Sequence, residues 1–197
     1  MIDGKVLDSF RDRRVLVTGG TGLIGRQVVD ILAVAGALVR IVSLDNVAVP
    51  AGTEHILGDL RSFEFCREIV KDMDDVFHIA GVGASVSAST ERPASHFVPT
   101  LMMNANVLEA CRLGGVTRVV FTSSVGAYAP AEVFREQDYR IDSPPMDFAG
   151  WAKRMAEAQI HAYRREYGLN NFAIVRPSNV YGPGDNFDPV NALVIPS

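Results

Sequence analysis

The sequence predicts an α/β fold built on a doubly wound, parallel β-sheet. Short runs of β-branched and other apolar residues alternate along the chain with longer segments of helical spacing, which is the order of strand–helix–strand units. The apolar runs do not alternate with polar residues, so each one predicts a strand that is buried on both faces. A glycine-rich turn follows the first run directly, as in sheets that bind a ligand at the carboxyl ends of their strands.

The individual elements follow from the same patterns. Strands are expected at 14–19, 38–44, 74–81, 118–124 and 171–177, and helices at 23–36, from about 93 to 113, and at 148–168. Gly36 and Gly168 stand where the helical spacing stops, and glycine is the usual residue just after a helix. A group of acidic residues is expected to form a solvated face: Glu64, Glu68, Asp72, Asp74 and Asp75.

Composition narrows the possible classes of function. The chain has 197 residues, a formal net charge of −4 and 48% hydrophobic residues, enough for one globular domain with a real core. The acidic balance and the lack of a Lys/Arg cluster argue against nucleic acid as a partner. No apolar run reaches the roughly 20 residues of a membrane span, and no signal-peptide pattern opens the chain, so a soluble protein of the cytoplasm is expected.

Cysteine and histidine usage gives no sign of a metal or disulfide site. Cys66 and Cys111 are the only cysteines and lie far apart in the sequence, which gives little support to a disulfide framework or a cysteine metal site. The four histidines share no metal-like spacing. His78 falls in a predicted buried strand and is expected to be a hydrogen-bonded core residue.

The glycine-rich turn predicts a dinucleotide-binding site in a Rossmann-type sheet. Gly19, Gly22 and Gly25 are spaced by three in TGGTGLIG, and their missing side chains let the backbone approach a pyrophosphate. Leu23 and Ile24 open the helix that follows, so their amides are expected to face the phosphates. Asp45 comes 20 residues after Gly25, at the end of the second strand, where a carboxylate binds ribose hydroxyls. The alternative is a turn without a ligand.

The same carboxylate favours NAD over NADP. An acid at the end of the second strand repels a 2′-phosphate, and Asp45 has Asn46 beside it. Arg40 and Arg61 speak against this choice, because an arginine that folded back could pair with the extra phosphate.

Six segments together resemble one enzyme family. They are TGGTGLIG, GDL at 58–60, HIAG at 78–81, FTSS at 121–124, GWAKRMAE at 150–157 and VRPSNVYGPG at 175–184. This set is similar to the extended short-chain dehydrogenase/reductases of the NAD-dependent epimerase/dehydratase family, which act on nucleotide sugars. The resemblance implies further cofactor-binding residues at Asp59, Leu60, Ala80, Gly81, Thr122, Pro177, Asn179 and Val180, with Ser178 beside them. For Asp59, a helix N-terminal or turn carboxylate is the competing interpretation.

The resemblance also implies a division of the chain. Residues 1–181 are expected to form the NAD(P)-binding domain. The stretch 182–197 resembles the start of the sugar-nucleotide lobe in enzymes of the GDP-fucose synthase type, so that lobe is expected to be largely missing. The helices around 95–113 and 148–167 are expected to pair across a two-fold axis as a four-helix bundle, giving a homodimer.

Chemistry in this family rests on a serine or threonine, a tyrosine, and a lysine four residues after the tyrosine. The resemblance implies Ser124 for the hydroxyl and Lys153 for the lysine, with Ser124 and Asn179 also contacting the sugar. Ala149 stands at the tyrosine position, and a methyl group cannot transfer a proton. A solvated helix cation is the alternative interpretation of Lys153.

Three functions are therefore compatible with the sequence. The first is a nucleotide-sugar oxidoreductase, epimerase or dehydratase that is impaired by Ala149. The second is a non-catalytic module that binds NAD for structure or sensing. The third, a dimerisation domain that has lost its ligand, is disfavoured by the glycine turn and Asp45.

Overall fold

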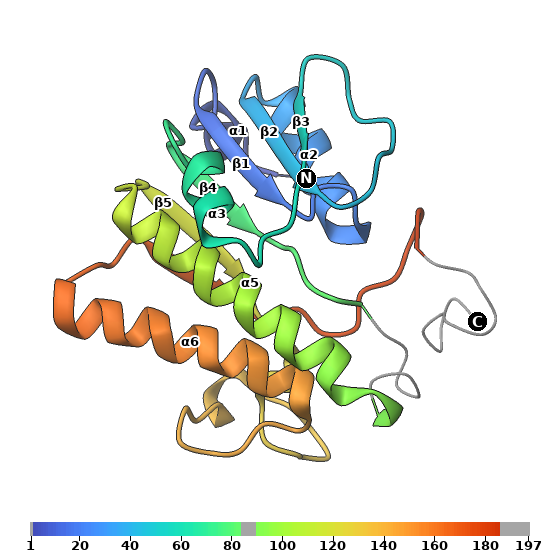
Figure 1. Ribbon diagram of the computed structural model, residues 1–197, viewed down its shortest axis with the longest axis vertical. Helices are drawn as coiled ribbons and strands as arrows, with labels where there is room; N and C mark the ends of the chain where they lie inside the picture. The colour runs from blue at the N-terminus through green and yellow to red at the C-terminus, as the bar shows by residue number, and fades with distance from the viewer. Residues whose placement is uncertain (1, 84–89, 186–197) are drawn as a thin grey trace.

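Six parallel strands form a single sheet in the order β3-β2-β1-β4-β5-β6 (Figure 1). The computed structural model describes residues 2–83 and 90–185. The strands are β1 Arg14–Thr18, β2 Leu38–Ser43, β3 Glu54–Leu57, β4 Asp75–His78, β5 Arg118–Thr122 and β6 Phe172–Val175. The strand order reverses between β1 and β4, and the carboxyl ends of the strands open there into a crevice that favours ligand binding. The predicted doubly wound fold is confirmed.

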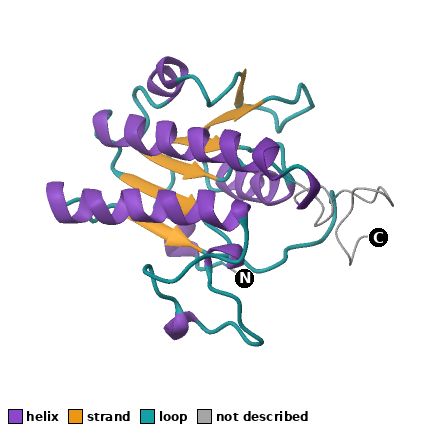
Figure 2. Cartoon of the chain, turned by 60° about the horizontal axis from the view of Figure 1, so that its bottom comes forward, coloured by secondary structure: helices purple, strands orange, loops and turns teal. Residues whose placement is uncertain are grey.

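Helices cover both faces of the sheet (Figure 2). Helices α3 Phe63–Ile69, α5 Pro93–Leu113 and α6 Phe148–Tyr167 share one apolar core with the sheet. Helix α2, Leu23–Val34, packs through Val29 and Leu32 on the other face. The structure also contains a short helix, α1 Gly4–Asp8, and two 3₁₀ turns, η1 Val125–Ala127 and η2 Glu136–Asp138.

Helix α6 begins and ends at residues whose chemistry explains its length. The carboxylate of Asp147 accepts a hydrogen bond from the backbone N–H of Gly150 at 2.6 Å, which satisfies one of the free amides of the first turn. Gly168 ends the helix in the left-handed conformation, with φ of 67°, which glycine adopts without steric cost. The stop predicted at Gly168 is thus confirmed.

The acidic stretch after the second strand is more ordered than predicted. It contains β3 and α3, two short elements that the sequence analysis did not predict. The prediction that Asp75 belongs to a solvated face is wrong, since its side chain is only 2% exposed and pairs with Arg13 and Arg118. Two guanidinium groups compensate the buried carboxylate there, and neither is near it in the sequence.

The structure leaves the predicted division of the chain untested. Of the expected substrate-lobe segment 182–197, the part beyond Asp185 lies outside the described residues.

Candidate functional site

A cleft of about 600 Å³ lies at the carboxyl ends of the strands, where the strand order reverses. It brings together nearly all of the residues selected from the sequence: Gly19, Gly22, Leu23, Ile24, Gly25, Asp45, Asp59, Leu60, Ala80, Gly81, Thr122, Ser124, Lys153, Pro177, Asn179 and Val180. Asn46 and Ala149 do not line it. Asn46 is outside the lining because it comes after the turn that holds Asp45. Ala149 is outside it because its side chain ends at the Cβ atom.

The glycine-rich turn forms a tightly packed cradle at one end of the cleft. Gly19 has a φ of +69°, and a Cβ atom there would lie 2.8 Å from the Cα atom of Ala80. A Cβ atom on Gly25 would lie 2.8 Å from the Cα atom of Gly20, so neither position has room for a side chain. Gly22 precedes helix α2, and no side chain caps the first-turn amides. These free N–H groups fit the pyrophosphate of a dinucleotide.

The carboxylate of Asp45 lies next to the glycine turn in the cleft. The hydroxyl of Thr21 donates to Asp45 Oδ2 at 3.4 Å, which connects the glycine turn to the end of β2. Arg40 donates to Glu54 Oε2 at 2.7 Å and to the carbonyl of Ile69 at 3.0 Å. The guanidinium of Arg40 therefore points to the edge strand and helix α3 rather than to Asp45.

Asp59 and Arg61 form their own pair beside the cleft. The backbone and side chain of Arg61 both donate to the Asp59 carboxylate, at 2.9 Å and 2.8 Å. These hydrogen bonds hold the pKa of Asp59 below its ordinary value. Asp59 is therefore a turn carboxylate and also part of the cleft wall. Since Arg61 is occupied as well, both arginines that argued for NADP have other partners.

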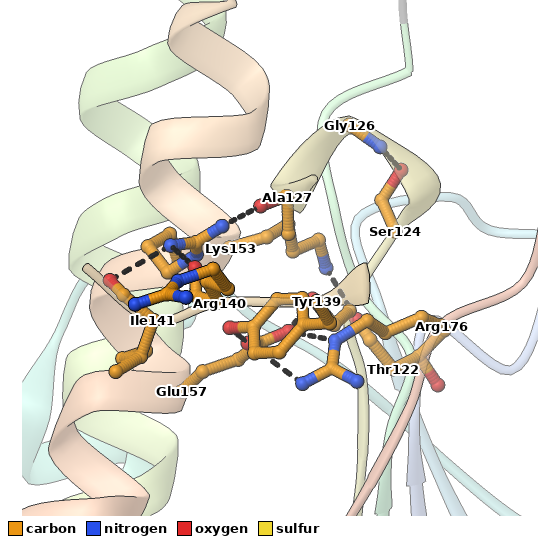
Figure 3. Close-up of polar contacts among 12 residues, drawn as sticks. Thr122, Ser124, Gly126, Ala127, Tyr139, Arg140, Ile141, Lys153, Glu157 and Arg176 are labelled. Carbon is orange, nitrogen blue, oxygen red and sulfur yellow. Dashed lines mark hydrogen bonds and ion pairs between the residues drawn. The ribbon is translucent and has the colours of Figure 1, made fainter. Parts of the chain in front are cut away.

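Lys153 is the only basic side chain that lines the cleft in the described part of the chain. Its Nζ atom donates to the carbonyl oxygen of Thr122 at 2.8 Å (Figure 3). It also lies 5.1 Å from the centre of the Phe121 ring. Burial lowers the pKa of Lys153 to about 8, because a cation loses its hydration there. The alternative of a solvated helix cation is wrong.

Ser124 immediately precedes the η1 turn, next to the start of helix α6. Its Oγ atom accepts a hydrogen bond from the N–H of Gly126 at 3.1 Å (Figure 3). A Cβ atom on Gly150 would overlap the carbonyl group of Gly126, so the missing side chain of Gly150 lets the helix touch this turn. Ala149 therefore lies beside the turn that follows Ser124, and Lys153 comes one helical turn after Ala149. Ala149 itself is exposed.

The neighbouring tyrosines do not replace the missing hydroxyl in the cleft. Tyr128 is buried against Tyr139, and neither lines the cleft. The hydroxyl of Tyr139 donates to the carboxylate of Glu157. Among the described residues that line the cleft, none is a tyrosine.

A buried polar cluster behind the cleft was not found by the sequence analysis. The carboxylate of Glu157 has no exposed surface and accepts a hydrogen bond from Arg176 at 2.8 Å (Figure 3). It also accepts a hydrogen bond from Ser123 at 2.5 Å. Ser123 also lines the cleft. The position of Glu157, four residues after Lys153 on the same helix face, was the one local signal. Its partners come from distant parts of the sequence.

The prediction for His78 is confirmed. Its side chain is fully buried, with Nδ1 2.7 Å from the hydroxyl of Thr18 and Nε2 3.0 Å from Oδ1 of Asn104. Burial lowers the pKa of His78 to about 3, so the ring is neutral and donates from Nε2 to the amide oxygen. No group of three or more potential metal ligands occurs in residues 2–83 and 90–185. The same residues contain no helix that is long and apolar enough to span a bilayer.

Comparisons with known proteins agree with this geometry. The chain is 33% identical over 180 residues to UDP-glucose 4-epimerase from Azospirillum brasilense, which covers 86% of this chain and 49% of that protein. It is 30% identical over 194 residues to short-chain dehydrogenase/reductase family 42E member 1 from Bos taurus, covering 91% and 49%. The chain thus spans about half the length of these relatives.

A solved structure gives the same result. The Thermus thermophilus UDP-glucose 4-epimerase, in complex with NAD, superimposes with a TM-score of 0.76 at 32% identity, over 88% of this chain and 57% of that one. The model of the NAD dependent epimerase/dehydratase family matches residues 15–197. With a Rossmann-type sheet, a glycine cradle and a cleft at the strand reversal, the chain belongs to the NAD-dependent epimerase/dehydratase family.

Proposed function

We propose that this chain is the cofactor-binding part of an NAD-dependent nucleotide-sugar oxidoreductase, epimerase or dehydratase whose proton-transfer step is impaired. One observation carries the proposal. A single cleft joins the glycine cradle and Asp45 to Ser124 and Lys153, whereas Ala149 occupies the helical position one turn before the lysine. The site therefore keeps the groups that bind and orient but lacks a phenol.

The roles of the residues follow from their positions. When NAD is bound, it supplies a hydride acceptor or donor. The amides around Gly22 would hold its pyrophosphate, and Asp45 would accept hydrogen bonds from the adenosine ribose. Ser124 orients a substrate oxygen, and the Lys153 ammonium stabilises negative charge that develops nearby. A proton must still leave or reach the substrate oxygen, and Ala149 has no group for that step.

We propose NAD rather than NADP as the preferred cofactor. The Asp45 carboxylate repels a 2′-phosphate, and the two nearby arginines are held by Glu54 and Asp59. Calorimetry on the chain is expected to give a lower dissociation constant for NADH than for NADPH. Tighter binding of NADPH would refute the role of Asp45.

A second function is favoured by the absence of a tyrosine from the described cleft lining. In this version the chain binds NAD for structure or sensing without transferring hydride. The two functions differ in what Ala149→Tyr does in a protein that also supplies a sugar-binding half. An impaired enzyme should gain roughly 10²–10⁴-fold in turnover of its nucleotide sugar, whereas a binding module should gain nothing.

The placement of Ala149 can be tested without a sugar. In the chain bearing Ala149→Tyr, Lys153 should lower the pKa of the introduced phenol below its ordinary value of about 10. The measurement is an ultraviolet difference titration against the unmodified chain, which removes the signal of the native tyrosines. In a Lys153→Met background the phenol should titrate at its ordinary value. Equal titration curves in both backgrounds would show that position 149 does not face the lysine.

A further inference from the structure

The turn that presents Asp45 to the cleft is fixed by a serine that also lines the cleft. Ser43 is the last residue of β2 and is only 8% exposed. Its hydroxyl donates to the carbonyl oxygen of Asp45 at 3.0 Å, and its own carbonyl accepts from the N–H of Gly58 at 3.1 Å. The backbone of Asp45 is therefore tied to the end of the strand, two residues before it.

The hydroxyl of Ser43 has a second partner on the neighbouring strand. His55 lies on β3 with Nε2 2.7 Å from Ser43 Oγ. A hydroxyl has one proton to donate. Because that proton goes to the carbonyl of Asp45, His55 must donate its Nε2–H to Ser43 Oγ. The three groups form a directed chain: imidazole to hydroxyl, hydroxyl to carbonyl.

The parallel pairing of β2 and β3 makes this contact possible. Ile41 pairs with His55 and Ser43 pairs with Leu57, so His55 lies diagonally across from Ser43 on the same face of the sheet. The neighbouring acid, Glu54, points to the other face and is held by Arg40. Thus, among the described contacts of this part of β3, the imidazole of His55 pairs with Ser43 and the carboxylate of Glu54 pairs with Arg40.

We propose that His55 and Ser43 are positioning residues that set the discrimination between NAD and NADP. They act through Asp45, whose carboxylate Oδ2 is held from the other side by Thr21 at 3.4 Å. With its backbone fixed by Ser43 and its side chain by Thr21, Asp45 stays where a 2′-hydroxyl would donate to it and a 2′-phosphate would be repelled. This inference rests on the proposed cofactor role of the cleft.

Discrimination between the two cofactors depends on where the Asp45 carboxylate is held. Repulsion of a phosphate and hydrogen bonding to a hydroxyl both depend on the position of Asp45, and the turn after β2 is otherwise exposed. Without the Ser43 hydroxyl, the carbonyl of Asp45 loses its side-chain partner and the turn can rotate. The loss of one hydrogen bond of this kind changes an equilibrium by about three- to tenfold.

The test measures NADH and NADPH binding by calorimetry on the whole chain. Ser43→Ala and His55→Phe are expected to reduce the ratio of the two affinities by about three- to tenfold. His55→Gln should restore the ratio, because its amide N–H can replace the imidazole donor. Thr53→Ala is the matched control, since it removes a hydroxyl that donates to the Pro50 carbonyl at 2.7 Å in the same connection.

A double-mutant cycle separates positioning from general damage to the fold. In an Asp45→Asn background, Ser43→Ala should cause no further change in the ratio, because the charge on which it acts is gone. The proposal is overturned if Ser43→Ala and His55→Phe both keep the original ratio of NADH affinity to NADPH affinity. It is also overturned if Ser43→Ala changes this ratio equally in the unmodified and the Asp45→Asn backgrounds. Failure of the unmodified chain to favour NADH would instead overturn the proposed cofactor, and this inference with it.

Discussion

The contact between Gly150 and Gly126 gives the sharpest test of how the site is assembled. Gly150 lies in the first turn of α6, and Gly126 belongs to the turn that follows Ser124. A Cβ atom on Gly150 would lie 2.6 Å from the carbonyl carbon of Gly126. Ordinary contact starts near 3.4 Å, and the obstacle is backbone, so no rotamer change can relieve the overlap.

The size of the effect follows from two opposing terms. Overpacking costs about 1–3 kcal/mol, and a rigid backbone neighbour places Gly150→Ala toward the upper end. The better helix propensity of alanine returns at most about 1 kcal/mol. We therefore expect Gly150→Ala to lower the free energy of unfolding by about 2 kcal/mol, which corresponds to a Tm lower by about 4–8 °C for a chain of this size.

Two other glycines supply matched controls. A Cβ atom on Gly126 would lie 3.5 Å from its nearest neighbours, and one on Gly4 would meet nothing within 4 Å. Gly126→Ala and Gly4→Ala are therefore expected to leave Tm nearly unchanged. Scanning calorimetry on the three variants measures the difference. If Gly150→Ala unfolds at the same temperature as Gly126→Ala, the close contact does not exist and the placement of Ser124 beside α6 is wrong.

Asp75 lies at the other end of the sheet. Burial raises the pKa of its carboxyl group, but the hydrogen bonds from Arg118 and Arg13 lower this pKa by more, so the net shift is downward. Their stabilisation is complete above the unfolded pKa of about 3.9 and is lost as the pH falls through the folded value. Asp75→Asn should cost about 2–3 kcal/mol at pH 7, and urea unfolding should show the difference shrinking below about pH 4. A constant difference would contradict the ion pairs. Exposed apolar residues on α5 and α6 suit the homodimer we propose; Met102 and Met155 are 43% and 47% exposed. Light scattering should show that Met155→Glu dissociates the dimer, whereas Val34→Glu, at a residue of α2 that is 85% exposed, should not. A monomeric unmodified chain would remove the basis for this surface.

Residues close together in the sequence determined much of the site. The three glycines and Asp45 could be assigned because a turn, a helix start and a strand end follow one another within one strand–helix–strand unit. Ala149 and Lys153 could be placed on one helix face because positions four apart share it. The sheet was predictable for a similar reason, since each buried strand is a continuous apolar run.

Tertiary structure alone decided the long-range contacts, both around the cleft and at the opposite end of the sheet. Ser43 meets His55 across two strands, Ser123 meets Glu157 at a separation of 34 residues, and Asp75 meets Arg13 at a separation of 62. No periodic pattern marks such partners, because each contact depends on which strand lies beside which and in what register. From the sequence, an acid such as Asp75 is predicted to be solvated, because its partners Arg13 and Arg118 become its neighbours only after the sheet has formed.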